Sequence, residues 1–166
     1  VARATIFCSH AQVCSFCELL DALEQHLALM GHSVAHTYVW LDVFSIRQHR
    51  VSDDVRHIGY IERQIGQVVV VLDPWDKPVC LTRVWCLYEV AQAKVPGSQV
   101  DLKLTMPPTQ RAAMQRALQK DRRALEAALQ SIDARRADAS VEADKVAIFT
   151  QIVEWFKGTS EPLDAL

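Results

Sequence analysis

Hydrophobic positions in the first hundred residues alternate between the period of a strand and the period of a helix. Short apolar runs at residues 4–8 and 37–44 predict two strands. Residues 67–72 predict a third strand. Because its VVVVL run is apolar at every position, it is typical of a parallel-sheet strand that is covered on both faces. A weaker alternating pattern at residues 100–104 predicts a fourth strand.

Apolar residues with helical spacing fill the intervals between these strands. Residues 13–30 predict one helix, Ser52 or Asp53 caps a second that Gly66 ends, and residues 81–94 predict a third. Strands that alternate with helices form right-handed crossovers in one parallel sheet. The predicted fold class is therefore α/β, with a flavodoxin-like parallel sheet in the order 2-1-3-4, four or five strands, and helices on both sides.

The remainder of the chain is rich in strong helix formers. Its pattern predicts one helix over residues 109–130 and another over residues 141–156. An apolar stripe that includes Leu118 and Leu125 must cover either the sheet or another copy of the chain. The other faces mix acidic and basic residues, which is typical of a solvated surface. The predicted organisation is an α/β core at residues 1–107, a helical C-terminal elaboration of the same domain at residues 108–158, and a tail at residues 159–166.

Composition narrows the classes of partner. The chain has 166 residues, half of them hydrophobic, which suits one domain with a substantial core. Its net charge of −2 argues against nucleic acid or an anionic membrane as a partner. The longest apolar run, residues 68–72, is far shorter than the roughly 20 residues of a membrane-spanning helix. The five glycines have no spacing that would form a phosphate-binding loop.

The five cysteines favour free thiols over a disulfide scaffold, because their number is odd and the core is large. We therefore predict a reducing, cytoplasmic setting. Cys14 and Cys17, with His10 nearby, suggest a zinc or redox site, but the spacing of Cys80 and Cys86 does not supply the second pair that structural zinc needs. The prediction is that no metal is bound.

The segment TRVWCLYE carries the strongest chemical signal. On a helix, Thr82, Cys86 and Glu89 share one stripe, with Trp85 beside it, and the other positions are apolar. Glu89 therefore lies at the margin of buried surface, where something must offset the cost of desolvating its carboxylate. Either a salt bridge to a nearby Lys or Arg or a functional role would do so.

Several linked motifs resemble a TIR domain. They are FCSH after the first strand, WLDVF with its acidic residue in the second, IERQIGQVVVVLDPW, and the W-C-x-x-E helix that follows the third strand. The similarity covers roughly residues 3–107 and is greatest to a TIR-like group of algal and other protist proteins. Where many TIR domains have serine after the third strand, this chain has Asp73.

The resemblance implies an activity. In the enzymatic TIR branch the motif glutamate cleaves NAD+ between nicotinamide and ribose, by hydrolysis or cyclisation, in immune or stress signalling, which places catalysis on Glu89 and the nicotinamide neighbour on Trp85. NAD+ is then a substrate, and no cofactor is expected. TIR enzymes also self-associate through TIR–TIR contacts. The alternative implied by the same family is a non-catalytic scaffold for homotypic assembly.

Further substrate contacts are expected at the carboxyl ends of the strands, where ligands of open parallel sheets bind. Asp42 either contacts ligand or hydrogen-bonds the loop after it, and Arg47 and Arg50 either meet a pyrophosphate or remain solvated. The predicted substrate-binding residues besides Trp85 are Ser9, His10, Phe44, Ser45, Arg47, Asp73 and Trp75.

Overall fold

The computed structural model describes residues 2–46, 57–139 and 141–157. Within these residues a four-stranded sheet occupies the centre, every neighbouring pair of strands is parallel, and the order is β2-β1-β3-β4. The predicted flavodoxin-like order is confirmed. The strands are β1 (Ile6–Ser9), β2 (Val39–Trp40), β3 (Gln67–Val71) and β4 (Asp101–Thr105).

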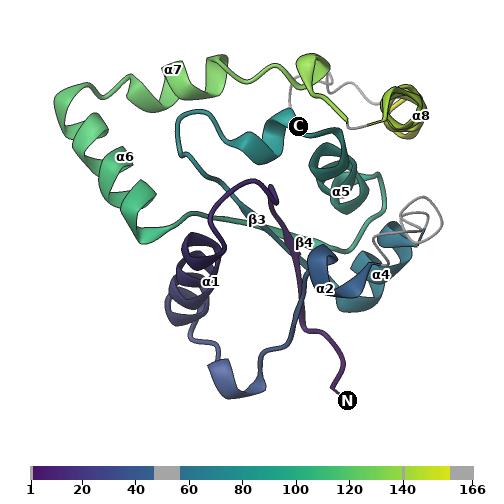
Figure 1. Cartoon of the computed structure of the whole chain (residues 1–166), viewed down its shortest axis with the longest axis horizontal. Helices are drawn as coiled ribbons and strands as arrows, with labels where there is room; N and C mark the ends of the chain where they lie inside the picture. Colours follow the sequence, from purple (N-terminus) through teal and green to yellow (C-terminus); the bar gives the residue numbers. More distant parts are fainter. Residues whose placement is uncertain (1, 47–56, 140, 158–166) are drawn as a thin grey trace.

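Helices cover both faces of the sheet (Figure 1), with α1 on one side and α4 and α5 on the other. The α-helices are α1 (Phe16–Met30), α2 (Asp42–Ser45), α4 (Ile58–Ile65), α5 (Val84–Lys94), α6 (Pro108–Lys120), α7 (Ala124–Gln130) and α8 (Glu142–Trp155). Short 3₁₀ helices are η1 (Val34–His36), η2 (Val79–Thr82) and η3 (Ala134–Arg136). No helix in the described part of the chain has the length and apolar character needed to cross a membrane.

Two cores form on the two faces of the sheet because successive residues of a strand point in opposite directions. On the α1 face lie Ile6 and Val69, and on the α4 and α5 face lie Phe7, Val68 and Val70. Val68, Val69 and Val70 are all 0% exposed, which confirms that β3 is covered on both faces. The register places Phe7 opposite Val68.

The second predicted strand, residues 37–44, is wrong in its second half. Pairing in β2 ends at Trp40, and Asp42 begins helix α2 instead of lying in a strand. Asp42 Oδ1 accepts a hydrogen bond from the Val43 backbone N–H at 2.7 Å, and the Asp42 carbonyl accepts one from Ile46 N–H at 2.9 Å. A carboxylate in the first turn suits the positive end of a helix.

The predicted helix over residues 81–94 also begins later. Arg83 is extended, with φ −111° and ψ 123°, and separates η2 from α5. The reason is a parallel β-bridge between Arg83 and Asp138 in which Val84 N–H donates to the Asp138 carbonyl at 3.0 Å. Thr82 therefore does not share the α5 stripe of Cys86 and Glu89, which corrects that part of the prediction.

The predicted long helix over residues 109–130 is two helices. Asp121 leaves the helical conformation at φ −143°, and its Oδ1 accepts a hydrogen bond from the Arg123 N–H at 2.9 Å. Such a local side-chain bond competes with helix continuation. Helix α6 then lies beside α1, where Thr109 donates to Glu18 and Arg111 to Gln25, each at 2.8 Å.

Helix boundaries elsewhere follow their caps. Helix α1 begins at Phe16, three residues later than predicted, because Ser15 is its N-cap. Gly66 ends α4 as predicted, in the left-handed conformation at φ 81° that glycine adopts without strain. The caps predicted at Ser52 and Asp53 lie outside the described residues.

Candidate functional site

Glu89 lies in the second turn of α5, and only 7% of its surface is exposed. It is thus more deeply buried than the margin position that the sequence predicts. Among the described residues Glu89 forms no ion pair, so the salt bridge that would give it a structural role is not found there. Its carboxyl group is therefore desolvated without a compensating cation.

The surroundings of Glu89 favour the protonated acid. The pKa of its carboxyl is raised to about 8. Burial is the main cause, the hydroxyl of Ser9 acts in the opposite direction, and the charge of Asp42 adds to the rise. Ser9 is 1% exposed at the end of β1, and its Oγ has no partner at standard hydrogen-bond geometry among the described residues. The Ser9 hydroxyl is thus available beside the carboxyl.

The end of β1 is tied to α5 and to α2. Cys86 Sγ donates to the His10 carbonyl at 3.3 Å, which fixes α5 against the residue after the strand. His10 Nε2 lies 3.9 Å from Asp42 Oδ1, and Gln12 donates to the other oxygen of Asp42. Burial lowers the pKa of His10, and Asp42 acts in the opposite direction. Ser9, His10, Asp42 and Glu89 thus form one polar cluster.

Asp73 lines a small cavity next to His10. The Cys14 thiol donates to the Asp73 carbonyl at 3.6 Å, and both residues line a cavity of about 10 Å³ together with His10. That volume is about the least that holds one water molecule. Burial raises the pKa of the Asp73 carboxyl, and the charge of Glu18 adds to this effect.

The two tryptophans of the predicted site point to different parts of the molecule. Trp85 is half-buried beside Glu89 on α5, and its ring meets that of Tyr88 edge-on at 6.0 Å. Trp75 is half-buried in the loop after β3, and its backbone N–H donates to Gln110 Oε1 on α6 at 3.2 Å. Only Trp85 shares an element with Glu89.

Phe44 and Ser45 lie on α2, and Phe44 contacts α1. The Phe44 side chain is 74% exposed, and its ring meets that of Phe16 edge-on with the centroids 6.0 Å apart. Arg47 and Arg50, the predicted pyrophosphate contacts, lie outside the described residues. Of the predicted site residues that the structure describes, it brings together Glu89, Ser9, His10 and Trp85, with Asp73 at the edge.

The sequence reasoning missed a second buried acid, Glu62 on α4. It is 0% exposed, and neither carboxyl oxygen has a hydrogen-bond partner among the described residues. Burial raises its pKa to about 9, and the charge of Glu89 is the next cause. Its spacing from Ile58 and Ile65 puts Glu62 on the apolar face of the helix, a signal that the sequence did contain.

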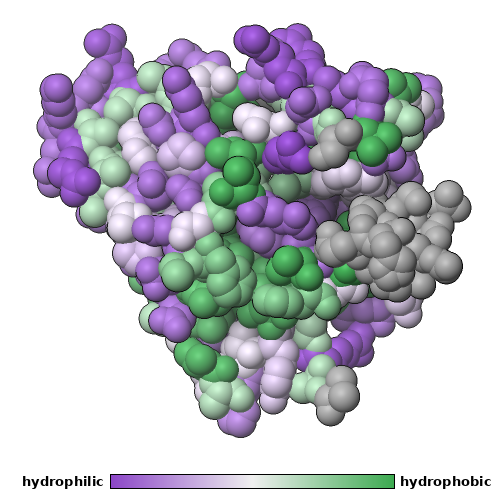
Figure 2. All heavy atoms as spheres, viewed as in Figure 1, coloured by the Kyte–Doolittle hydropathy of each residue, from purple (hydrophilic) through white to green (hydrophobic). Residues whose placement is uncertain are grey.

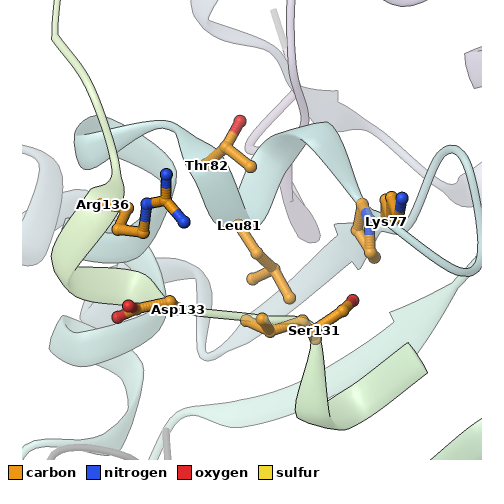
Figure 3. Close-up of a pocket in the computed structure, with 8 residues that line it drawn as sticks. Lys77, Leu81, Thr82, Ser131, Asp133 and Arg136 are labelled. Atoms are coloured by element: carbon orange, nitrogen blue, oxygen red, sulfur yellow. The ribbon is translucent and has the colours of Figure 1, made fainter. Parts of the chain in front are cut away.

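No group of three or more metal-ligating side chains occurs in the described parts of the chain, and all five cysteines are free. A larger pocket, about 220 Å³, is lined by Lys77 and Pro78 from the loop after β3 and by residues of the segment after α7 (Figure 3). Searches against family models, curated proteins and solved structures find no match to this chain.

Proposed function

We propose that the chain is a TIR-like enzyme that cleaves NAD+ at the nicotinamide–ribose bond, with Glu89 as its catalytic residue. The observation that carries the proposal is the desolvated carboxyl of Glu89, which no cation neutralises among the described residues. Strongly perturbed carboxyl groups of this kind concentrate at functional sites. A cationic ligand supplies the missing charge.

The chemistry requires little beyond that carboxylate. The C–N bond breaks with its electron pair going to the pyridinium nitrogen, so nicotinamide leaves as a neutral molecule. The ribose gains oxocarbenium character, which the Glu89 carboxylate stabilises in a site of low dielectric. Water then attacks the ribosyl carbon and releases a proton, or the adenine ring attacks in a cyclisation.

The neighbours of Glu89 have roles that fit this reaction. Trp85 packs beside the nicotinamide, and the Ser9 hydroxyl orients the carboxylate or a ribose hydroxyl. The cavity next to His10 is too small for a dinucleotide, so substrate entry requires the site to open. Self-association is the event that opens it in this proposal, because TIR enzymes assemble to complete their sites.

The test is incubation of the concentrated chain with NAD+ at pH 8.5, followed by chromatography of the products. We expect nicotinamide release by the wild type and at least a hundredfold loss in Glu89→Gln and Glu89→Ala. Glu126→Gln removes an exposed carboxylate on α7 and serves as the matched control. An intact NAD+ pool with folded wild type, with and without crowding agents, would reject the enzyme.

A second candidate function is a scaffold that binds further copies of the chain. It is favoured by an exposed apolar patch, which Figure 2 shows over α1 and α2. Patches of this kind on a protein surface mark interaction sites. The patch consists of Val13, Phe16, Leu20, Val43 and Phe44, with Val13 80% and Phe44 74% exposed.

Sedimentation at increasing concentration tests the scaffold. We expect the wild type to self-associate and Phe44→Ser to weaken association at least tenfold. Leu129→Ser removes another exposed apolar side chain, on α7 and 60% exposed, and is expected to have no effect. If both variants associate like the wild type, the patch is not the interface. An associating Glu89→Gln variant without NAD+ cleavage would show that the two functions are separable.

The remaining proposals concern the setting. The free thiols of all five cysteines suit the reducing cytoplasm. A role in immune or stress signalling rests on the TIR resemblance alone.

A further inference from the structure

A pocket separate from the Glu89 cluster lies between the loop after β3 and the segment that follows α7. Its volume is about 220 Å³. The loop after β3 and η2 line it with Lys77, Leu81 and Thr82. The segment after α7 lines it with Ser131, Asp133 and Arg136 (Figure 3). The two sides are far apart in the sequence, so the tertiary fold creates the pocket.

Two contacts join these walls, and one buried residue anchors the second wall to the core. Ser131 Oγ lies 3.4 Å from the Asp76 carbonyl, and Asp138 N–H donates to the Thr82 carbonyl at 2.9 Å. Ala137, between Arg136 and Asp138, is 0% exposed in the core that contains α5. The pocket is therefore preformed, and a ligand does not have to order its walls.

The charge balance in the pocket is positive. Asp133 pairs mainly with Arg135, whose Nε donates to Asp133 Oδ1 at 2.9 Å. Arg135 holds the pKa of Asp133 below its usual range, and the charge of Arg136 adds a smaller effect in the same direction. Neither Lys77 nor Arg136 forms an ion pair with any residue that the structure describes. Two cations and one carboxylate thus line the cavity, and neither cation is held in an ion pair with a described residue.

The other residues that line the pocket are mostly apolar, so they suit a ligand with an apolar middle. Pro78, Leu81 and Ile132 supply apolar surface. The Thr82 hydroxyl donates to the Val79 carbonyl at 2.8 Å, and the Ser131 hydroxyl donates to the Ala128 carbonyl at 2.7 Å. Because both protons are already used, the hydroxyls do not bind anions, and this function falls to Lys77 and Arg136.

We propose that this pocket binds a short organic dianion with one anionic group at each end and an apolar middle. Figure 3 shows Arg136 and Lys77 on opposite sides of the cavity, with Leu81 between them. The planar guanidinium of Arg136 matches a carboxylate or phosphate in a bidentate arrangement, and Lys77 acts as a point charge at the other end. The site is independent of NAD+ cleavage at Glu89.

Calorimetric titration of the full chain tests the proposal at fixed ionic strength. The probes are the dicarboxylates succinate, adipate and suberate, the monocarboxylate hexanoate, and hexane-1,6-diyl bisphosphate. We expect at least one dicarboxylate to bind tenfold or more tightly than hexanoate. The bisphosphate distinguishes phosphate ends from carboxylate ends, because its affinity is compared with that of adipate, which has the same number of carbon atoms.

Single variants supply the second readout. In Lys77→Gln or Arg136→Gln, the best dicarboxylate and hexanoate are expected to bind alike, because only one anionic end retains its cation. A double variant that combines Lys77→Gln with Arg136→Gln is expected to lose the preference too. Its matched control is Arg116→Gln with Lys120→Gln, two exposed cations of α6 whose loss changes the net charge equally. This control is expected to keep the wild-type preference.

Two results would overturn the proposal. One is that no probe with two charges binds more tightly than hexanoate. The other is that the α6 control loses the preference as fully as the pocket variants, which would mean that net charge alone attracts the probes. Glu89→Gln is expected to leave dicarboxylate binding unchanged, and a loss in that variant would assign the probe to the other site.

Discussion

At the scale of single residues, the unusual feature is two buried acids that face the same core. Glu62 and Glu89 are 0% and 7% exposed, and burial raises the pKa of each, to about 9 and about 8. No ion pair with either acid occurs within the described residues. At neutral pH both acids are mainly protonated, since each ionised form would lack hydration.

Stability is therefore expected to fall as the pH rises. The pKa of Glu62 is raised from 4.5 to about 9 on folding, so between these values the unfolded state has released a proton that the folded state keeps. This contribution to stability is fully present below pH 4.5 and is lost as the pH rises through about 9.

Glu62→Gln tests this dependence, because it removes the ionisation while keeping the shape. We expect the variant to be more stable than the wild type at pH 7 by about 1–3 kcal/mol, and the difference to vanish below pH 4.5. Urea unfolding at a series of pH values measures the slope. Glu126→Gln is the exposed control, and equal slopes in all three proteins would contradict the assignment.

The pH dependence of the proposed NAD+ cleavage would follow from the ionisation of Glu89. Only the ionised carboxylate stabilises an oxocarbenium ion, so activity is expected to rise with pH and to level off above about 8. Below about pH 8, the cleavage rate should increase by nearly tenfold for each pH unit. Initial rates from pH 5.5 to 9.5 check this, and a rate that peaks near pH 6 would exclude Glu89 as the group that controls the reaction.

At the scale of elements, the close approach of α4 to α5 determines where Glu62 and Glu89 lie. A Cβ atom at Gly59 would come within 2.5 Å of the Gln92 side chain. That side chain is held, because Gln92 Nε2 donates to the Tyr88 hydroxyl at 3.1 Å and Gln92 Oε1 accepts from Arg63 at 3.4 Å. Glycine at position 59 thus allows the two helices to approach.

Gly59→Ala is expected to destabilise the wild type but to stabilise a Gln92→Ala variant. In the wild type it displaces Gln92, breaks these hydrogen bonds and lowers the free energy of unfolding by about 1–2 kcal/mol. In a Gln92→Ala background the added methyl group has space, and the higher helix propensity of alanine stabilises by a few tenths to about 1 kcal/mol. Chemical unfolding of the four proteins in this double-mutant cycle gives the coupling.

At the scale of the whole molecule, the C-terminal segment completes the core on the α5 face. Ala137, Ile148 and Ile152 are buried in the same cluster as Phe7, and Trp155 packs on Tyr88 with the ring centroids 5.3 Å apart. Figure 1 shows α8 next to α5, on the side away from α1. The helical elaboration thus covers the helix that carries Glu89.

Because this core is shared, the chain is expected to unfold in one transition. Ile152→Ala should lower the free energy of unfolding by about 2–4 kcal/mol without splitting that transition. Val146→Ala, at a position of α8 that is 61% exposed, should change it by less than about 0.5 kcal/mol. A separate early transition in Ile152→Ala, seen by circular dichroism and by tryptophan fluorescence, would mean that α8 folds independently.

Local pattern was enough to predict the sheet and its order. The apolar run of β3 and the alternation of strand and helix follow from side-chain period, which neighbouring residues set. The predicted extents failed where one local signal overrode the pattern. The Asp42 and Asp121 side chains accept hydrogen bonds from the backbone N–H groups of Val43 and Arg123. The late start of α5 was not visible in any local pattern, because its cause is the distant Asp138.

Some features of the candidate site followed from the sequence, and others depended on the tertiary structure. The motif around Trp85 and Glu89 placed an aromatic ring and a carboxyl on one helix, which spacing alone determines. Only the tertiary structure decided that Glu89 is buried without a cation, that Ser9 and His10 lie beside it, and that Lys77 and Arg136 face one cavity. Burial and charge compensation depend on which distant segments pack together, and local sequence patterns do not predict those contacts.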